Sequence, residues 1–372
     1  MSQGALKEIY AIPALPPRAD LETIEVLKAL NHATRRLAEV KGRALVIPNQ
    51  GMLIDTLSLQ EAKDSSEIEN IVTTNDVLFK GDFEKLGSNC GAAKEVAKYR
   101  DALRAGFENL CEKEIISNRT LVEMFRILKN RDDGFRKVPG TGLANDRGKI
   151  VYVPPQSPAD VEKHMRALEL YINEECGLDP LIRMAIIHHQ FESIHPFPDG
   201  NGRIGRMLNV LYLTKTNLLD IPVLYMSRGI NRRKSDYYRL LQKVRDEDAW
   251  SEWVVFMLEV VSETSDLTLI LIEGIREQMA FYKEIIRKRH PKMYSQDLIN
   301  NLFRHPYTRI EYVMSELNVS RPTATSYLER LVSDEEIPLL KVVEGRNNYY
   351  VNTGLVQLLG GVGEANERRG EI

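Results

Sequence analysis

The sequence has few cysteines and no long apolar segment. Only Cys90, Cys111 and Cys176 occur among 372 residues, and none of them forms a CxxC pair. This pattern excludes a disulfide framework, gives no support to a zinc site, and is typical of reduced thiols in the cytosol. No run approaches the roughly 20 apolar residues of a membrane span, and the first residues lack the apolar core of a signal peptide. We therefore expect a cytoplasmic protein that has no contact with a membrane.

The chain also lacks an excess of one charge. Its 50 basic and 53 acidic side chains leave a formal net charge of -3, so the bulk charge favours no particular partner. With 43% hydrophobic and 28% charged residues, the composition is that of a globular protein with ample material for a core. No repeat of fixed period is visible. The length predicts two or three domains.

Helical periodicity dominates the first four fifths of the chain. Apolar residues recur at three- and four-residue steps in most of it, and the expected helices cover 20–40, 53–72, parts of 81–130, 159–175, 180–194, 203–217, 235–245 and 250–289. A segment rich in Gly and Pro, 132–158, interrupts this pattern and contains one short β-like run at 150–153. We interpret this segment as a loop or hairpin.

The composition changes after Pro291. Two helical pieces joined at "LNVS" are followed by two β-runs around a Gly-Arg-Asn-Asn turn, which is the element order of a winged helix. The predicted fold is thus mainly α, with a short β-hairpin and a C-terminal α+β domain. The expected parts are an N-terminal helical region (1–85), a central domain (86–265), a linker helix (266–294), a winged-helix domain (295–360) and a flexible tail (361–372).

One segment, "HPFPDGNGRIGR", concentrates groups that bind anions. Gly200, Asn201 and Gly202 directly precede a predicted helix that starts near Arg203. A helix N-terminus presents unpaired N–H groups and positive potential, and glycines let the backbone approach a ligand closely. Arg203 and Arg206 project from the same face of the first turn, where their guanidinium groups would bind further phosphate oxygens. These residues predict a site for a polyphosphate.

Two further groups in this segment indicate chemistry as well as binding. Asp199 would repel an anion, so a carboxylate at this position favours a Mg²⁺ ion between it and the phosphates. His195 has an ordinary pKa near ~6.5 and can accept a proton at physiological pH. We therefore expect a nucleotide-polyphosphate site with a base beside it.

The same segment resembles a known family. "HPFPDGNGRIGR" matches in full the Fic-domain motif HPFx(D/E)GN(G/K)RxxR, and "IHHQFESIHPF" before it and "YYRLLQKVR" after it are similar to the flanking family helices. Two N-terminal stretches, "LPPRADLETIEVLKALNHATRRLAEVKG" and "EAKDSSEIENIVTT", resemble the region ahead of many bacterial Fic domains, so the likeness extends over roughly residues 10–260. Such proteins typically transfer AMP from ATP to a hydroxyl side chain of a protein.

The resemblance implies a role for each matching residue. His195 would deprotonate the target Tyr, Thr or Ser hydroxyl, Phe197 would anchor the loop, and Asp199 would hold Mg²⁺. Arg203 would stabilise the leaving pyrophosphate and Arg206 the γ-phosphate. The full ATP-binding set that it implies is Asp199, Gly200, Asn201, Gly202, Arg203, Ile204, Gly205, Arg206 and Tyr237. For Tyr237, lining the adenine pocket and serving as a core aromatic both stay open. The run Ile150, Val151, Tyr152 and Val153 takes the place of the family's target-docking flap.

A second motif implies self-inhibition. "SSEIEN" matches the family's inhibitory-helix pattern (S/T)xxxE(G/N) through Ser65, Glu69 and Asn70. By this resemblance Glu69 would pair with Arg206, removing the guanidinium from the γ-phosphate and adding negative charge where ATP binds. The alternative is an exposed Glu on a solvated helix face.

The predicted function is AMP transfer from ATP to a protein, and the chain itself is one of the candidate targets. Removal of AMP and transfer of a phosphoryl group remain enzymatic alternatives. A nucleotide-sensing transcription regulator is the alternative from another class. The C-terminal domain is equally suited to binding DNA or protein, and a homodimer that governs the inhibition is a further hypothesis.

Overall fold

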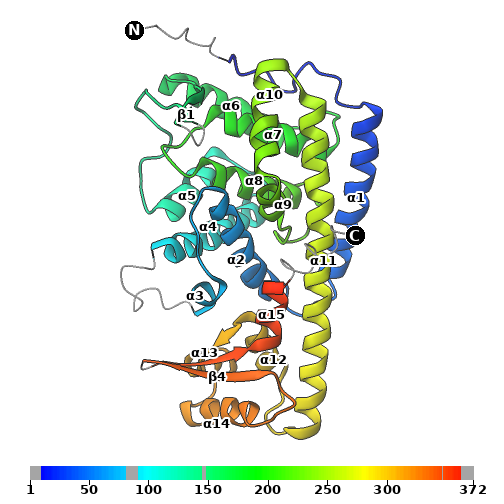
Figure 1. Ribbon diagram of the computed structural model, residues 1–372, viewed down its shortest axis with the longest axis vertical. Helices are drawn as coiled ribbons and strands as arrows, with labels where there is room; N and C mark the ends of the chain where they lie inside the picture. Colours follow the sequence, from blue (N-terminus) through cyan, green and yellow to red (C-terminus); the bar gives the residue numbers. More distant parts are fainter. Residues whose placement is uncertain (1–9, 81–90, 145–147, 346, 362–372) are drawn as a thin grey trace.

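A computed structural model describes residues 10–80, 91–144, 148–345 and 347–361, which are mostly helical (Figure 1). A larger helical body is built from α1(Ile24–Ala44), α2(Gln50–Ile68), α3(Asn75–Lys80), α4(Gly91–Lys113), α5(Asn118–Lys129), α6(Pro158–Asn173), α7(Pro180–Ile194), α8(Asn201–Lys215), α9(Met226–Arg232), α10(Lys234–Glu247) and α11(Trp250–Arg289). A smaller C-terminal module contains α12(Gln296–Arg304), α13(Ile310–Leu317), α14(Arg321–Val332) and α15(Thr353–Gly361). The mainly α fold class predicted from the sequence is confirmed.

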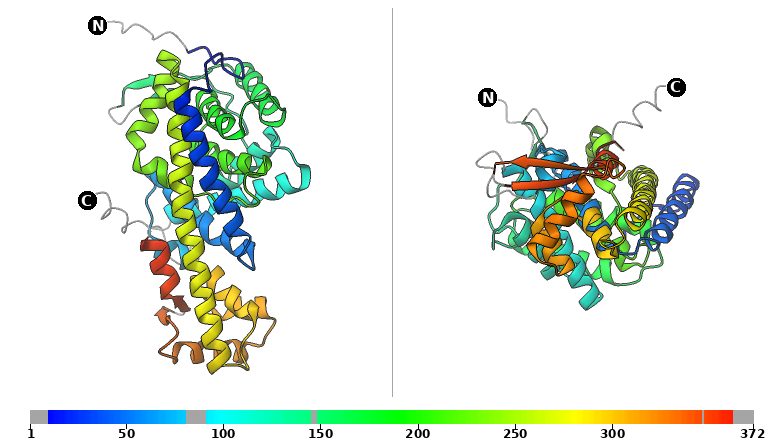
Figure 2. Two further views of the ribbon diagram at one scale, coloured as in Figure 1. Left: turned by 90° about the vertical axis from the view of Figure 1, so that its right-hand side faces the viewer. Right: turned by 90° about the horizontal axis from the view of Figure 1, so that it is seen from below.

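One helix extends through both parts. α11 has 40 residues, and α1 packs along its first half, as Figure 2 shows. The second half of α11 contacts α12 and α15 of the C-terminal module. The predicted boundary between residues 265 and 266 therefore falls inside a continuous helix.

The centre of the larger body is the pair α7 and α8. Every residue from Leu181 to Ile194 is buried, because α7 is covered by α6, α8 and α11. α7 begins with Asp179 as N-cap, whose side chain accepts a hydrogen bond from the Leu181 N–H, and with Pro180 in the first turn. The loop between α7 and α8 contains the predicted polyphosphate motif.

α2 lies between the central pair and the C-terminal module. On the module side, Thr56 Oγ1 donates to the Phe303 carbonyl (3.3 Å), and Asp55 forms an ion pair with Arg304 (3.4 Å). On the other side α2 contacts α4, α8 and α9. This position brings the C-terminal end of α2, with Glu69, against the start of α8.

Two small antiparallel sheets complete the fold. β1(Leu143–Ala144) pairs with β2(Ile150–Tyr152) in the hairpin expected there. In the C-terminal module, β3(Tyr307–Thr308), β4(Leu339–Glu344) and β5(Asn347–Asn352) form a sheet of order β3-β5-β4. Helix, strand, two helices and hairpin follow one another as in a winged helix. Most of the predicted tail, 361–372, lies outside the described residues.

None of the helices in the described part of the chain is both long and apolar enough to cross a bilayer.

Candidate functional site

The loop before α8 begins with a sharp change of direction at His195. This residue closes α7 in the left-handed conformation (φ 49°, ψ 60°), and its N–H still donates to the Phe191 carbonyl. Pro196 follows and cannot continue a helix. The imidazole is thereby placed at the point where the buried helix opens into the loop.

Phe197 and Asn201 hold the loop in shape. Phe197 is fully buried, and its ring stacks on Phe125 with centroids 4.5 Å apart. The Asn201 side chain accepts from the Phe197 N–H and donates to the Phe197 carbonyl, both at 2.8 Å. Phe197 is thus the anchor that the motif implied. The Asn201 amide closes the loop on itself, a use that the sequence did not indicate.

We expect Phe197→Ala to lower the free energy of unfolding by about 3 to 5 kcal/mol, because it removes a stacked ring from a closed site and leaves a cavity. Urea titration followed by circular dichroism measures this loss. Phe281→Ala is the matched control, since Phe281 is 46% exposed on α11 and should cost under about 1 kcal/mol. A loss of similar size in both variants would contradict the anchoring role.

The N-terminus of α8 is built as an anion cradle. Gly200 is its N-cap with φ 73°, a conformation that favours glycine, and no side chain caps the first turn. The N–H groups of this turn and the positive end of the helix dipole therefore face the cavity before it. A Cβ on Gly202 would lie 2.8 Å from both an Arg206 nitrogen and a Glu69 oxygen, so a larger residue here would displace one or both of these side chains.

Glu69 lies at this cradle and forms ion pairs with both arginines of the motif. Its Oε1 is 2.9 Å from Arg206 Nη2, and its Oε2 is 2.8 Å from Arg203 Nε. The sequence predicted the contact with Arg206; the contact with Arg203 is additional. Both arginine side chains are only 1% exposed, so these are ion pairs largely shielded from water.

The other two positions of the inhibitory pattern have structural roles at the end of α2. Ser65 is fully buried, and its hydroxyl and carbonyl oxygens accept from Arg206 Nε and Nη2, both at 2.8 Å. Asn70 follows the end of the helix with φ 62°, a left-handed conformation that Asn tolerates better than most residues. Ser65 thus fixes the Arg206 guanidinium, and Asn70 turns the chain so that Glu69 meets it.

A chain of charges that the sequence analysis missed connects Arg203 to Asp199. Arg203 Nη1 donates to Glu95 Oε1 (2.7 Å), which also accepts from Lys129 (2.7 Å). Lys129 Nζ then lies 2.6 Å from Asp199 Oδ2. Burial opposes ionisation of Asp199, but the hydrogen bond and charge of Lys129 outweigh it and hold the pKa of Asp199 below its usual range. Asp199 is therefore ionised at neutral pH.

His195 is held in its neutral form. Burial, followed by the charges of Arg136 and Arg245, lowers the pKa of His195 to about 4. Its Nδ1 is buried and has no hydrogen-bond partner among the described residues. An imidazole in this state can accept a proton at physiological pH.

These groups share one cavity of about 860 Å³. Among its lining residues are Glu69, Asn70, Glu95, Lys129, Leu143, Val151, Glu192, His195, Asp199, Gly200, Gly202, Arg203, Arg206, Tyr237, Tyr238, Gln242 and Arg245. This volume is within the usual range for a small-molecule site, roughly 300–1,000 Å³.

Some predicted ligand-contacting residues are placed differently. Ile204 and Gly205 are buried in α8 on its packed side, and neither they nor Asn201 is among the described residues that line the cavity. Tyr237 does line it, but only 1% of its surface is exposed and its hydroxyl bonds to His188 Nε2 at 2.8 Å. Tyr237 is thus a core aromatic at the wall of the cavity, and its contact with adenine stays a prediction.

The hairpin borders the same cavity. Leu143 and Val151 line it, while Ile150 is 59% exposed. Tyr152 is buried, and its hydroxyl donates to the Ser193 carbonyl at 2.7 Å. The strand at 150–152 is therefore fixed to the end of α7, beside His195.

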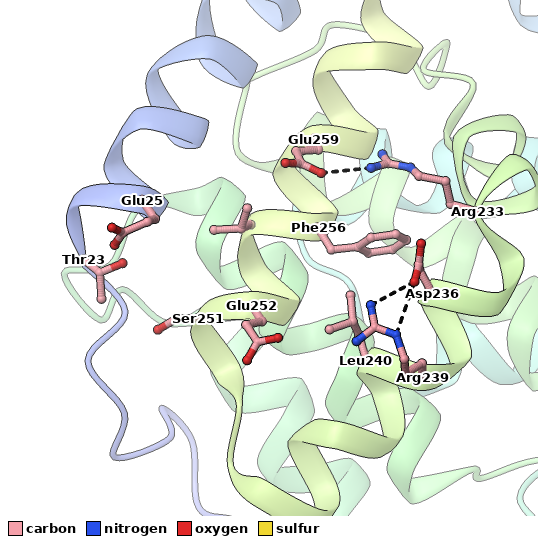
Figure 3. Close-up of a pocket in the computed structure, with 11 residues that line it drawn as sticks. Thr23, Glu25, Arg233, Asp236, Arg239, Leu240, Ser251, Glu252, Phe256 and Glu259 are labelled. Atoms are coloured by element: carbon pink, nitrogen blue, oxygen red, sulfur yellow. Dashed lines mark hydrogen bonds and ion pairs between the residues drawn. The ribbon is translucent and has the colours of Figure 1, made fainter. Parts of the chain in front are cut away.

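A second cavity, of about 510 Å³, lies between α1, α10 and α11 (Figure 3). None of the residues that the sequence analysis assigned to the site lines it. The Arg233–Glu259 (2.9 Å) and Arg239–Asp236 (2.8 Å) ion pairs in Figure 3 already neutralise much of its charge. The first cavity is therefore the candidate active site.

Comparison with protein families gives three matches, of which the first two adjoin. Residues 27–108 match the Fic/DOC family N-terminal model, and residues 109–213 match the Fic/DOC family model. Residues 279–355 match the C-terminal domain of SoFic-like protein adenylyltransferases. The first two matches together include both the inhibitory pattern and the polyphosphate motif.

Individual relatives are similar over part of the chain. A probable protein adenylyltransferase of Aquifex aeolicus is 30% identical over 175 residues, which are 45% of this chain and 51% of that protein. Protein adenylyltransferase Fic of Drosophila virilis is 31% identical over 130 residues, 34% of this chain and 25% of that protein. The match thus spans about half the length of the first relative and a quarter of the second.

Solved structures extend the likeness to nearly the whole chain. A crystal structure of a Fic family protein from Desulfovibrio desulfuricans superposes with a TM-score of 0.56 and 22% identity, covering 89% of this chain and 97% of that one. Fic-1 from C. elegans gives a TM-score of 0.52 and 19% identity over 68% and 74% of the two chains. At these identities the likeness concerns the fold. From its family matches, its motif and its fold, this chain is a member of the Fic/DOC family.

Proposed function

We propose that this chain transfers AMP from ATP to a hydroxyl side chain of a protein, and that Glu69 inhibits this activity. The supporting observation is that a neutral His195, the N-terminus of α8, which no side chain caps, and two buried arginines face one cavity. The names of the curated relatives, protein adenylyltransferases, favour the same reaction.

The proposed reaction is an in-line displacement at the α-phosphorus. His195 accepts the proton of the target Tyr, Thr or Ser hydroxyl, whose oxygen then bonds to the α-phosphorus. The bond from that phosphorus to the bridging oxygen of the β-phosphate breaks, and pyrophosphate leaves. Arg203 and Arg206 stabilise the charge on the leaving group. The protein's contribution is positioning and electrostatic stabilisation.

The donor set near Asp199 fits a Mg²⁺ ion that arrives with ATP. The described residues contain no cluster of three or more His, Cys, Asp or Glu side chains that could hold a metal ion, so these residues form no complete cage of their own. One ionised carboxylate at the cavity, completed by phosphate oxygens, is a usual arrangement for Mg²⁺. When bound, the ion neutralises phosphate charge. With Asp199 on the ion, Lys129 would keep its ion pair with Glu95 and lose the one with Asp199.

Inhibition follows from the ion pairs of Glu69. While it holds Arg203 and Arg206, its carboxylate places negative charge where the β- and γ-phosphates would bind. Productive ATP binding therefore requires the end of α2 to move or Glu69 to rotate away. Partner contacts of the C-terminal module, with DNA or protein, and a homodimer that controls this step remain predictions.

Two other reactions on this site stay as alternatives. Glycine at position 202 and both arginines favour AMP transfer over phosphoryl transfer, since related phosphoryl transferases commonly carry Lys at that position. Removal of AMP would use Glu69 to position a water molecule, and the Glu69 carboxylate does line the cavity.

Labelled nucleotide distinguishes these reactions. The Glu69→Gly variant is incubated with Mg²⁺ and a cell lysate, in parallel with ATP labelled on the α- or the γ-phosphate. AMP transfer labels protein bands from the α-label alone. Bands from the γ-label would replace the proposal by phosphoryl transfer. If the wild-type chain removes label from such pre-labelled bands and Glu69→Gly does not, AMP removal is the activity.

The pH dependence of the transfer should report the low pKa of His195. Neutral imidazole is the active form, so activity is present above its pKa and lost as the pH falls through it. Because the pKa of His195 is lowered to about 4, we expect the rate of Glu69→Gly to stay level down to about pH 5 and to fall below it.

One neighbouring group requires a control. Burial raises the pKa of Glu192 to about 7, and this carboxyl lines the same cavity. The profile is therefore repeated in Glu192→Gln, where the low-pH decline should persist. A decline centred near ~6.5 in both proteins would show an ordinary histidine and contradict the electrostatic assignment.

A further inference from the structure

Arg136 is a buried cation whose side-chain partners are backbone carbonyls. Only 5% of its surface is exposed, and Nε donates to the His195 carbonyl at 2.8 Å. Nη2 reaches the Ile194 carbonyl at 3.3 Å and also bonds to the Pro155 carbonyl. No carboxylate among the described residues lies within ion-pair distance of it. Because burying an unpaired charge is costly, its place beside the site needs an explanation.

Two of these carbonyls, those of Ile194 and His195, are among the groups that the end of α7 leaves without helical partners. A helix C-terminus has four such groups, and here the chain turns left-handed at His195 instead of entering water. Arg136 satisfies two of them, Ile194 and His195, and the Tyr152 hydroxyl satisfies a third, at Ser193. The backbone that carries the imidazole is thus fixed by side chains from the segment between α5 and α6.

The same guanidinium links His195 to the flap. The Pro155 carbonyl, which accepts from the guanidinium, lies three residues after the end of β2. The backbone N–H of Arg136 also donates to the Pro196 carbonyl, at 2.8 Å. Arg136 therefore bonds both to the motif loop, which carries His195, and to the segment that follows the flap strand β2. Arg245 adds to this link, with its guanidinium 3.9 Å from the centre of the Tyr152 ring.

We propose that Arg136 is a positioning residue: it fixes the orientation of His195, keeps it neutral, and ties it to the flap strand that borders the cavity. This inference rests on the proposed role of His195 as base. The charged groups that face His195 are Arg136 from the α5–β1 loop, Arg245 from α10 and Asp199 from the motif loop. Burial and the two arginines favour the neutral ring, whereas the backbone of Glu192 and the charge of Asp199 favour its protonation.

The test uses Arg136→Met and Arg136→Lys in the full chain carrying Glu69→Gly. The pKa of His195 is read by NMR on histidine-labelled protein, with His195→Gln to assign its signal among the seven histidines. Arg136→Met removes the charge and should raise the pKa of His195 by about one unit. Arg136→Lys keeps a positive charge and should leave it within about half a unit of the parent. An unchanged pKa in Arg136→Met would overturn the proposal.

Kinetics supply the second measurement. Since the single ammonium nitrogen of Lys cannot take the places of both Nε and Nη2, Arg136→Lys should lower kcat for AMP transfer by about 10-fold, while the Kd for ATP changes by less than about 3-fold. Arg131→Met is the matched control: Arg131 lies in the same loop, is 53% exposed and pairs with Asp133. If Arg136→Met does not fold, Arg136→Lys decides, and a parental kcat in that variant refutes the proposal.

The two hypotheses fail in different ways. The NMR measurement needs no transfer activity, so an inactive Glu69→Gly parent would count against the proposed function and leave the effect of Arg136 on His195 measurable. An active parent with Arg136 variants that match it in pKa and kcat would count against the positioning role alone.

Discussion

Replacement of Glu69 by glycine should raise AMP transfer by about 10- to 100-fold, because it releases two buried guanidinium groups for the phosphates. In the wild-type chain each carboxylate oxygen of Glu69 is within 3 Å of one of them, at 2.9 Å from Arg206 and 2.8 Å from Arg203. The substitution also removes a negative charge from the place where the triphosphate binds. The measurement is the initial rate of labelling with α-labelled ATP, for purified wild type and variant.

Glu67→Gly is the control for this result. Glu67 lies in the same turn of α2 and carries the same charge, but the ion pairs to the two motif arginines come from Glu69. A similar rise in both variants would show that loosening the end of α2 is sufficient and that the carboxylate has no specific role. An unchanged rate in Glu69→Gly would remove the inhibition from this account.

His195→Ala should abolish the transfer, lowering the rate of Glu69→Gly by roughly 10²- to 10⁴-fold, the usual contribution of a general base. The cavity and the cradle at the start of α8 stay intact in this variant, so the Kd for ATP should change little. Rates come from the same labelling assay, and the Kd from calorimetry.

His164→Ala provides the matched comparison, since His164 lies on α6 and does not line the cavity. Its rate should equal that of the parent. A His195→Ala variant that still transfers AMP at a comparable rate would exclude His195 as the base. Loss of ATP binding in that variant would instead point to a structural role.

The sequence predicted those parts of the molecule that depend on local pattern. The helices at 180–194 and 250–289 have the predicted bounds, because helical periodicity and, for the first of them, the Asp179 cap and Pro180 are local properties of the sequence. The motif loop and the hairpin were predicted from the resemblance to the Fic family, and the family matches confirm that resemblance. The ion pair between Glu69 and Arg206 was expected only because that resemblance linked two motifs 137 residues apart.

The remaining parts of the site depend on contacts between elements that have no shared motif. Glu95 on α4 and Lys129 at the end of α5 meet Arg203 only after three helices pack together. Arg136 lies in a loop rich in Gly and Pro, where a single arginine gives no periodic signal. The side chain of Asn201 hydrogen-bonds to the backbone of Phe197 in its own loop, and this contact depends on where the buried Phe197 ring holds the loop. Ile204 and Gly205 pack inward because α8 is buried along most of its length.

The most direct test of the central claim is a crystal structure of Glu69→Gly with ATP and Mg²⁺. We expect the γ-phosphate against Arg206, the α-phosphate at the first turn of α8, and the imidazole of His195 on the side of the α-phosphorus opposite the leaving pyrophosphate. A nucleotide bound in the cavity between α1, α10 and α11, or a triphosphate whose α-phosphorus is out of reach of any hydroxyl bound to His195, would contradict the account.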